Sequence, residues 1–109
     1  MSADFSKVAN KADVPVGQVK VYTIAGKRIA VCNVEGKFFA VADLCTHDGG
    51  PLGEGELIEN TIECPRHGAR FDVATGAVVC MPAVVPIATY LCEVREDDLW
   101  IGVPASATK

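Results

Sequence analysis

Cysteine and histidine, two side chains that often bind transition metals, occur together in two short stretches of this sequence. The first stretch is Cys45-Thr-His47 and the second is Cys64-Pro-Arg-His67, with sixteen residues between them. The chain has only two histidines in 109 residues, and each lies within three residues of a cysteine. Thiolate and imidazole are ligands for soft and borderline metals. The pattern therefore predicts a metal centre whose ligands are Cys45, His47, Cys64 and His67.

Three interpretations of the four residues are open at this point. Structural zinc accepts two cysteines and two histidines, but its short motifs usually pair cysteine with cysteine and histidine with histidine. A Rieske-type [2Fe–2S] centre needs two thiolates on one iron and two imidazoles on the other, and two loops with one cysteine and one histidine each would supply them. In the third interpretation the residues are unrelated. It is disfavoured because both histidines of the chain belong to the pattern.

The elements that would hold such a centre are β-strands. Alternating apolar and polar residues, with glycine-containing turns between them, predict strands at 18–24, 28–34 and 37–42, which together form a three-stranded meander. Two further strands, at 89–94 and 99–103, are predicted to form a hairpin near the end of the chain. No segment shows a helical stripe of apolar residues. The sequence therefore predicts an all-β fold.

The middle of the chain has a different composition. From residue 43 to residue 82 it is rich in glycine and proline, with short predicted strands at 60–64 and 70–73. We expect one domain over residues 1–109, with a β-sandwich or barrel framework at about 1–42 and 83–109. The segment at about 43–82 is expected to form an inserted subdomain that carries both cysteine–histidine stretches on two loops.

Composition limits the classes of partner and the compartment. Half of the residues are hydrophobic, 22% are charged and the formal net charge is −4, so neither nucleic acid nor an anionic membrane is a favoured partner. The N-terminal residues have no apolar signal segment, and no stretch is long and apolar enough to span a bilayer. We expect a soluble, cytoplasmic protein. Cys32, Cys80 and Cys92 have apolar neighbours and are expected to be core thiols.

The two stretches resemble a known family. "CTHDGG" and "CPRHGARFDVATGAVV" are similar to the two cluster-binding loops of Rieske proteins, and "CMPAVVP" matches their proline loop through Pro82. The length of the chain resembles that of the stand-alone Rieske ferredoxins of bacterial ring-hydroxylating dioxygenase systems. The resemblance implies one [2Fe–2S] cluster per chain, with Cys45 and Cys64 on the buried ferric iron and His47 and His67 on the outer iron.

The sequence departs from one branch of that family. Rieske proteins of respiratory cytochrome bc complexes have a disulfide between the loops, but Gly50 and Arg66 stand where its cysteines would be. Those proteins also place a serine and a tyrosine, whose hydroxyls donate hydrogen bonds to sulfur, where this chain has Ala69 and Phe71. Neither residue has a hydroxyl to donate. The resemblance therefore implies a low-potential cluster.

The predicted function is one-electron transfer rather than catalysis. A Rieske oxygenase needs a second, mononuclear iron with its own histidines, and no third histidine exists. By resemblance, the chain would pass electrons from an NAD(P)H-dependent flavin reductase to a terminal aromatic-ring oxygenase in aromatic hydrocarbon catabolism. It would do so as a monomer that docks transiently at the cluster tip. The alternative is a zinc- or iron–sulfur-stabilised, non-catalytic module of a larger enzyme complex. Acidic residues near the motif could form the docking surface: Asp48, Glu54, Glu56, Glu59 and Glu63.

Overall fold

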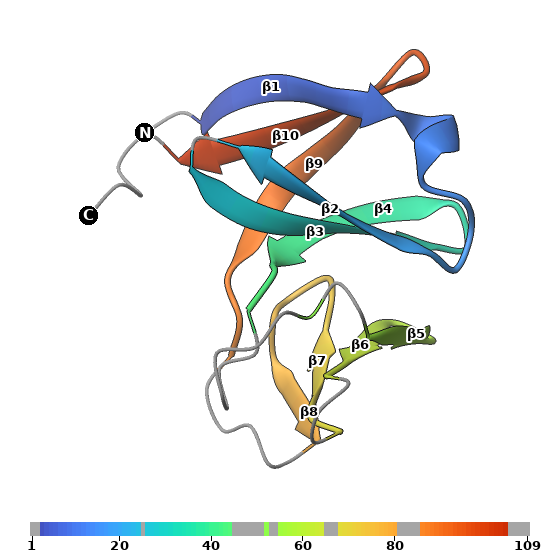
Figure 1. Cartoon of the computed structure of the whole chain (residues 1–109), viewed down its shortest axis with the longest axis vertical. Coiled ribbons are helices and arrows are strands. Elements are labelled where there is room, and N and C mark those ends of the chain that lie inside the picture. The colour runs from blue at the N-terminus through green and yellow to red at the C-terminus, as the bar shows by residue number, and fades with distance from the viewer. Residues whose placement is uncertain are drawn as a thin grey trace.

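The architecture consists of two β-sheets, one above the other in Figure 1. It comes from a computed structural model, which describes residues 3–24, 26–44, 52, 55–64, 68–80 and 86–104. Over those ranges the chain has ten strands and one short 3-10 helix, and no α-helix. No helix in the described part of the chain is long and apolar enough to cross a membrane. The all-β fold predicted from the sequence is confirmed.

The larger sheet has six antiparallel strands in the order β1-β10-β9-β4-β3-β2. Strands β1 and β2 end the sheet on either side and approach each other, so the sheet curls into a nearly closed barrel (Figure 1). Such closure leaves little free strand edge. The strands are β1 (Ala3–Asn10), β2 (Val19–Ile24), β3 (Lys27–Val34), β4 (Lys37–Ala42), β9 (Thr89–Arg95) and β10 (Asp98–Pro104).

In the meander β2-β3-β4, three strands that follow one another in the sequence are also neighbours in the sheet. Strand β3 pairs along its length with β2 and β4, and a two-residue turn at Glu35 and Gly36 joins β3 to β4. Both turn residues have positive φ, 54° and 92°, which suits the right-handed twist of a hairpin. Side chains on one face of β3, such as Ile29 and Val31, fill the barrel together with Leu99 and Ile101.

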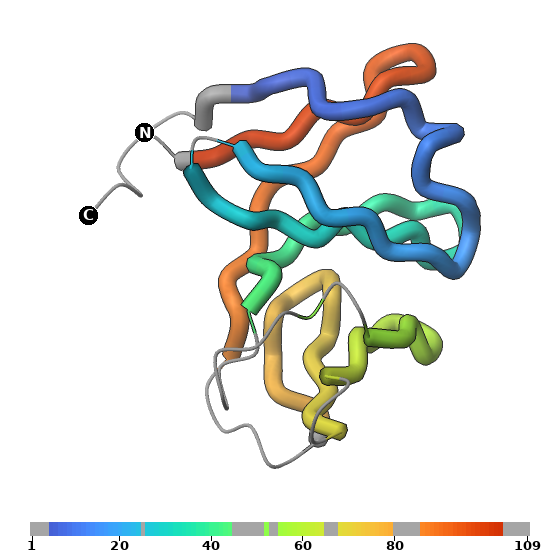
Figure 2. Tube along the Cα trace, in the orientation of Figure 1, coloured from blue at the N-terminus to red at the C-terminus, as the bar shows by residue number. Residues whose placement is uncertain are grey.

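The smaller sheet has four antiparallel strands and lies between β4 and β9 in the sequence. Its order is β5-β6-β7-β8, with β5 (Glu56–Ile58), β6 (Thr61–Glu63), β7 (Arg70–Asp72) and β8 (Val78–Cys80). In the tube view of Figure 2 the yellow and orange hairpin β7-β8 lies below the barrel. The 3-10 helix η1 (Lys11–Asp13) instead follows β1 and is capped by Asn10.

A second apolar core joins the two sheets. The outer face of the barrel contributes Ala30, Cys32 and Val41, while the small sheet contributes Ile62 and Phe71. All five side chains are completely buried. Burial of apolar surface is the main favourable contribution to folding, so this shared core fixes the small sheet against the barrel.

The strands predicted at 18–24, 28–34, 37–42, 89–94 and 99–103 are all present, with shifts of one residue at some ends. Strand β1 was not predicted. It pairs with β10 and closes the barrel, but its register shifts between Lys7 and Ala9. Because the shift interrupts the alternation of side chains, and because half of the segment is polar, its sequence lacks the period of a half-buried strand.

Candidate metal centre

One of the four predicted ligands, Cys64, lies among the described residues. Cys45, His47 and His67 lie outside them, as do Pro82 of the predicted proline loop and the two bc-branch positions Gly50 and Arg66. The chain on either side of each ligand stretch is described, however. These flanking residues show how the fold holds both stretches.

The carboxylate of Asp43 joins described residues on either side of the first stretch. This residue follows β4 directly, and its side chain is completely buried. Oδ2 accepts hydrogen bonds from Nε and Nη2 of Arg28, at 3.0 and 2.7 Å. Oδ1 accepts a hydrogen bond from the backbone N–H of Leu52 at 2.8 Å. The residues before and after the Cys45–His47 stretch are therefore joined to each other and to β3.

The second stretch belongs to the loop that connects β6 to β7, and backbone hydrogen bonds close the base of this loop. The N–H of Cys64 donates to the carbonyl of Ala69 at 2.7 Å, and the N–H of Gly68 donates to the carbonyl of Cys64 at 3.1 Å. Gly68 has a φ of +80°, which glycine adopts without strain. In addition to these hydrogen bonds, the side chains of Arg70 on β7 and Glu63 on β6 form an ion pair, with 3.5 Å between Nε and Oε2. The described residues thus fix the base of the loop that carries His67.

The segments that flank the two stretches are in contact with each other at Gly55. Its N–H donates to the carbonyl of Leu52 at 2.9 Å. Its Cα lies so close to the backbone of Glu63 that an added Cβ would overlap the Glu63 carbonyl oxygen. Since Glu63 directly precedes Cys64, the chain that follows the first stretch is packed at Gly55 against the strand that leads into the second.

The surroundings of Cys64 fit a ligand of an iron–sulfur cluster. The residue is 1% exposed and belongs to the apolar core between the sheets, with Leu52, Ala69 and Phe71. A thiolate alone in such a place would be costly, whereas a bound metal neutralises its charge. Exclusion of water on this side agrees with the inner, buried iron that the resemblance implies for Cys64.

Ala69 and Phe71, the two positions that lack a hydroxyl, are completely buried beside the second stretch. Both belong to the same core as Cys64. The Ala69 carbonyl is already an acceptor for the Cys64 N–H. Consequently neither side chain can offer a hydrogen bond to a sulfur atom at this site.

The other described cysteines are not ligands of this kind. Cys32 is completely buried, as predicted, and burial raises its pKa to about 12, with a smaller contribution from Cys92. Cys92 is only half-buried, so the prediction of a core thiol was too strong for this residue; burial and then Glu93 raise its pKa to about 11. Both thiols are protonated at neutral pH. The side chain of Cys80 lies outside the described set.

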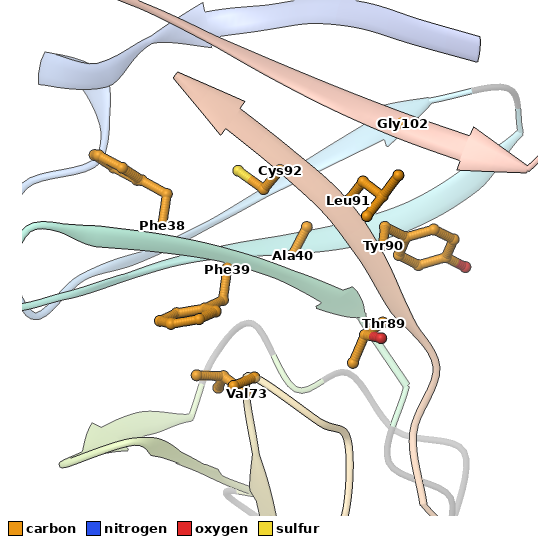
Figure 3. Close-up of a pocket in the computed structure, with 10 residues that line it drawn as sticks. Phe38, Phe39, Ala40, Val73, Thr89, Tyr90, Leu91, Cys92 and Gly102 are labelled. Atoms are coloured by element: carbon orange, nitrogen blue, oxygen red, sulfur yellow. The ribbon is translucent and has the colours of Figure 1, made fainter. Parts of the chain in front are cut away.

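Cys92 instead faces a groove of about 330 Å³ on the side of the barrel, where β4 and β9 separate (Figure 3). The two strands pair only at Ala40–Tyr90 and Val41–Thr89. Figure 3 shows Phe38 near Cys92 and Phe39 directed toward Val73 of the small sheet. Phe39 is packed against the core that contains Val73, so this wall of the groove also connects the sheets.

The acidic residues named as a docking surface are only partly described. Glu56 and Glu59 are exposed, whereas Glu63 is half-buried and paired with Arg70. Asp48 and Glu54 lie outside the described residues. Sequence reasoning did not identify Asp43, Arg28 or Gly55. The available signal was an aspartate at the end of an apolar strand, since aspartate is seldom buried without partners.

This chain is similar to known proteins over most of its length. The model of the family described as "Rieske [2Fe-2S] domain" matches residues 4–91. The biphenyl 2,3-dioxygenase ferredoxin component of Rhodococcus jostii (strain RHA1) is 34% identical over 103 residues, which are 94% of this chain and 96% of that protein. The ferredoxin component of the naphthalene 1,2-dioxygenase system of Pseudomonas aeruginosa is 42% identical over 91 residues, 84% of this chain and 88% of that protein.

A solved structure gives the same result for the fold. A chain in the complex of reduced oxygenase and oxidized ferredoxin in carbazole 1,9a-dioxygenase superimposes with a TM-score of 0.87 at 34% identity. The superposition covers 92% of this chain and 94% of that one. The predicted all-β, Rieske-type fold with a β-sandwich or barrel framework is therefore confirmed, and the small second sheet is a finding of the structure. The predicted [2Fe–2S] cofactor is confirmed by the matching family.

Proposed function

The chain belongs to the family of Rieske [2Fe-2S] domains, and from that membership we propose that it is the ferredoxin of a ring-hydroxylating oxygenase system. The observation that carries the proposal is the near full-length similarity to ferredoxin components of biphenyl and naphthalene dioxygenases. The prediction that the protein carries electrons and is not itself the catalyst agrees with the names of these relatives.

Four residues are proposed to hold the cluster: Cys45 and Cys64 on the inner iron, and His47 and His67 on the outer iron. The burial of Cys64 in the apolar core supports its inner position. When bound, the cluster supplies reversible one-electron chemistry. The chain contributes two loops with fixed ends, a water-excluding inner side, and no hydroxyl at Ala69 or Phe71, which favours a low reduction potential.

The unit that carries these ligands is proposed to be a subdomain at about residues 43–82 within a single Rieske domain, inserted into a framework at about 1–42 and 83–109. The small sheet β5-β8, which lies between β4 and β9 in sequence, supports this division. The hydrogen bond between the Ile87 N–H and the Gly76 carbonyl, 2.9 Å long, shows how closely the returning chain is attached.

The proposed partners are an NAD(P)H-dependent flavin reductase as donor and a terminal aromatic-ring oxygenase as acceptor, each bound transiently at the cluster tip. The structural match to a chain from an oxygenase–ferredoxin complex supports the second partner. The exposed carboxylates of Glu56 and Glu59 would contribute to electrostatic steering. We further propose a monomer in the cytoplasm, in agreement with the free thiols of Cys32 and Cys92.

The near full-length coverage of the two relatives, 96% and 88%, favours a separate carrier over a permanent module of a larger complex. The experiment that tests the proposal has two steps. Purified protein should contain about two irons and two acid-labile sulfides per chain, as a [2Fe–2S] centre requires. It should then be reduced by a flavin reductase and reoxidised by an aromatic-ring oxygenase over many turnovers. Zinc without sulfide would refute the cluster, and a cluster that no oxygenase reoxidises would refute the carrier role.

A further inference from the structure

The buried carboxylate of Asp43 has an arrangement that requires explanation. Its side chain has no exposed surface, although its partner Arg28 is 63% exposed. Transfer of a charge from water into a protein interior is costly, and replacement of a buried ion pair by apolar side chains is often neutral or stabilising. Stability alone is therefore a weak reason for an aspartate at this position. Its hydrogen bonds suggest a second reason.

The two carboxylate oxygens have different partners. Oδ2 receives both Arg28 hydrogen bonds, which fix the orientation of the carboxylate group against β3. Oδ1 receives the Leu52 N–H from nine residues further along the chain. The backbone N–H of Asp43 also donates to the Arg28 carbonyl at 3.0 Å. The loop between residues 43 and 52 is thus closed by a side chain that is itself held on two sides.

The same contacts continue to the second ligand-bearing loop. Leu52 accepts the Gly55 N–H, and Gly55 is packed against the Glu63 carbonyl. Glu63 precedes Cys64, and Leu52 and Cys64 share one buried core. Asp43 lies two residues before Cys45, within about 8 Å along the backbone. A shift of the Asp43 carboxylate would therefore change the separation of Cys45 from Cys64.

We propose that Asp43 is a positioning residue for the iron–sulfur centre: its Oδ1 bond to Leu52 sets the spacing between the two loops that carry the ligands. The inference rests on the proposed ligand set, because it requires Cys45 and Cys64 to bind the same cluster. Arg28 acts through Asp43 by holding its carboxylate in place. None of the three residues touches the iron in this scheme.

Two substitutions separate the hydrogen bond from the charge. Asp43→Asn keeps an oxygen that accepts the Leu52 N–H, and the exposed Arg28 side chain can turn toward water. Asp43→Ala removes the acceptor and leaves a buried N–H without its partner. We expect the asparagine variant to keep the wild-type electron paramagnetic resonance g values and visible circular dichroism. The alanine variant should show shifted g values and about tenfold faster cluster loss in the presence of a chelator.

A matched control distinguishes positioning from general stability. Asn33 is another buried polar side chain that joins two backbone segments, since its Nδ2 donates to the Val14 carbonyl at 2.7 Å and its Oδ1 accepts the Gly36 N–H at 2.8 Å. It lies in the barrel, at the far end of β3 from Arg28. Asn33→Ala should lower the denaturation midpoint as Asp43→Ala does, but with unchanged g values and an unchanged rate of cluster loss in native buffer.

The experiment uses the full chain with its cluster bound, and each result either supports or overturns the positioning role of Asp43. Wild-type g values and cluster lifetime in Asp43→Ala would overturn the positioning role while the proposed function stands. The same effect on the spectrum in Asn33→Ala would also overturn it. A wild-type protein without a Rieske spectrum would overturn the ligand set and this inference together. If Asp43→Ala does not fold, Asp43→Leu replaces it, because leucine also lacks an acceptor for the Leu52 N–H but fills the buried space. Altered g values would then support the proposal, and unaltered ones would overturn it.

Discussion

Gly55 lies directly against the backbone carbonyl of Glu63, with no room for a side chain between them. This contact brings the end of the segment that contains Cys45 and His47 against the strand that leads into Cys64. Glycine is needed here for close approach and not for a positive φ, since Gly55 is not among the left-handed residues of the chain. The spacing of the proposed ligand loops therefore depends on the absence of a single methyl group.

Gly55→Ala should consequently affect both stability and the cluster. The added Cβ overlaps a backbone atom, which cannot rotate away, so we expect about 1–3 kcal/mol of destabilisation, as for other overpacked sites. Denaturant unfolding gives the free energy, and the decay of visible absorbance gives the cluster lifetime, which should shorten.

Gly26→Ala is the control for Gly55→Ala. Gly26 has a φ of +79° and open space around its missing Cβ. Its replacement introduces only backbone strain, about 1–2 kcal/mol, in a barrel turn. The cluster lifetime should then be that of the wild type. Equal lifetimes in both variants would show that the Gly55 contact does not hold the loops.

Replacement of His67 by alanine tests a proposed ligand itself. The described part of the small sheet consists of three-residue strands, and among the described residues the N–H groups of Cys64 and Gly68 make the backbone hydrogen bonds at the base of the 64–69 loop. A bound cluster stabilises the folded state because the unfolded chain has no preformed site. We expect the Rieske spectrum to disappear and the melting temperature to fall.

Thr75→Ala is a suitable companion to His67→Ala. Its hydroxyl accepts the exposed Ala77 N–H, at 3.2 Å, in the β7-β8 turn of the same small sheet. It should retain the spectrum and nearly all of the stability. A His67→Ala protein with the native signal and native melting temperature would remove His67 from the ligand set.

The sequence predicts the barrel strands and the ligand pattern better than it predicts the residues that hold the ligand loops. The strands at 18–24 and 28–34 follow from regular alternation, and the cysteine–histidine spacing is specific enough to predict the cofactor. The residues that hold the loops have no such local signal. Asp43 is recognisable only once Arg28 and Leu52 are known to be its neighbours, fifteen and nine residues away in sequence.

The thiol of Cys32 should make the stability dependent on alkaline pH. Burial raises its pKa from 9.0 to about 12, so the folded chain keeps a proton that the unfolded chain releases. The stabilisation is complete below pH 9 and decreases as the pH rises toward the folded-state value, by on the order of 1 kcal/mol per pH unit. Denaturant unfolding at several pH values between 8 and 11 should show this slope.

Cys32→Ala removes one of two thiols with a raised pKa and should make the slope above pH 9 about half as steep, because Cys92 keeps its own raised pKa of about 11. The neighbouring Val31→Ala, also at a completely buried position of β3, provides a comparable loss of packing with the thiol intact. It should be less stable than the wild type at every pH but keep the alkaline slope. Parallel profiles for the wild type and Cys32→Ala would assign the slope to other groups.

The reduction potential is expected near the lower end of the Rieske range, which extends from about −150 to +300 mV. A hydrogen bond to sulfur favours the reduced cluster, because reduction adds negative charge. Ala69 and Phe71 are buried in the core of Cys64 and donate none. A differential of ~1–2 kcal/mol per bond equals roughly 40–80 mV for one electron, so the two bonds restored in Ala69→Ser with Phe71→Tyr should raise the potential by about 80–160 mV. Ala40→Ser, a buried alanine in the barrel core, should leave it unchanged.

Protein-film voltammetry measures all three proteins. A wild-type value above about +100 mV would contradict the low-potential assignment, and an unchanged double variant would show that the missing hydroxyls are not its cause.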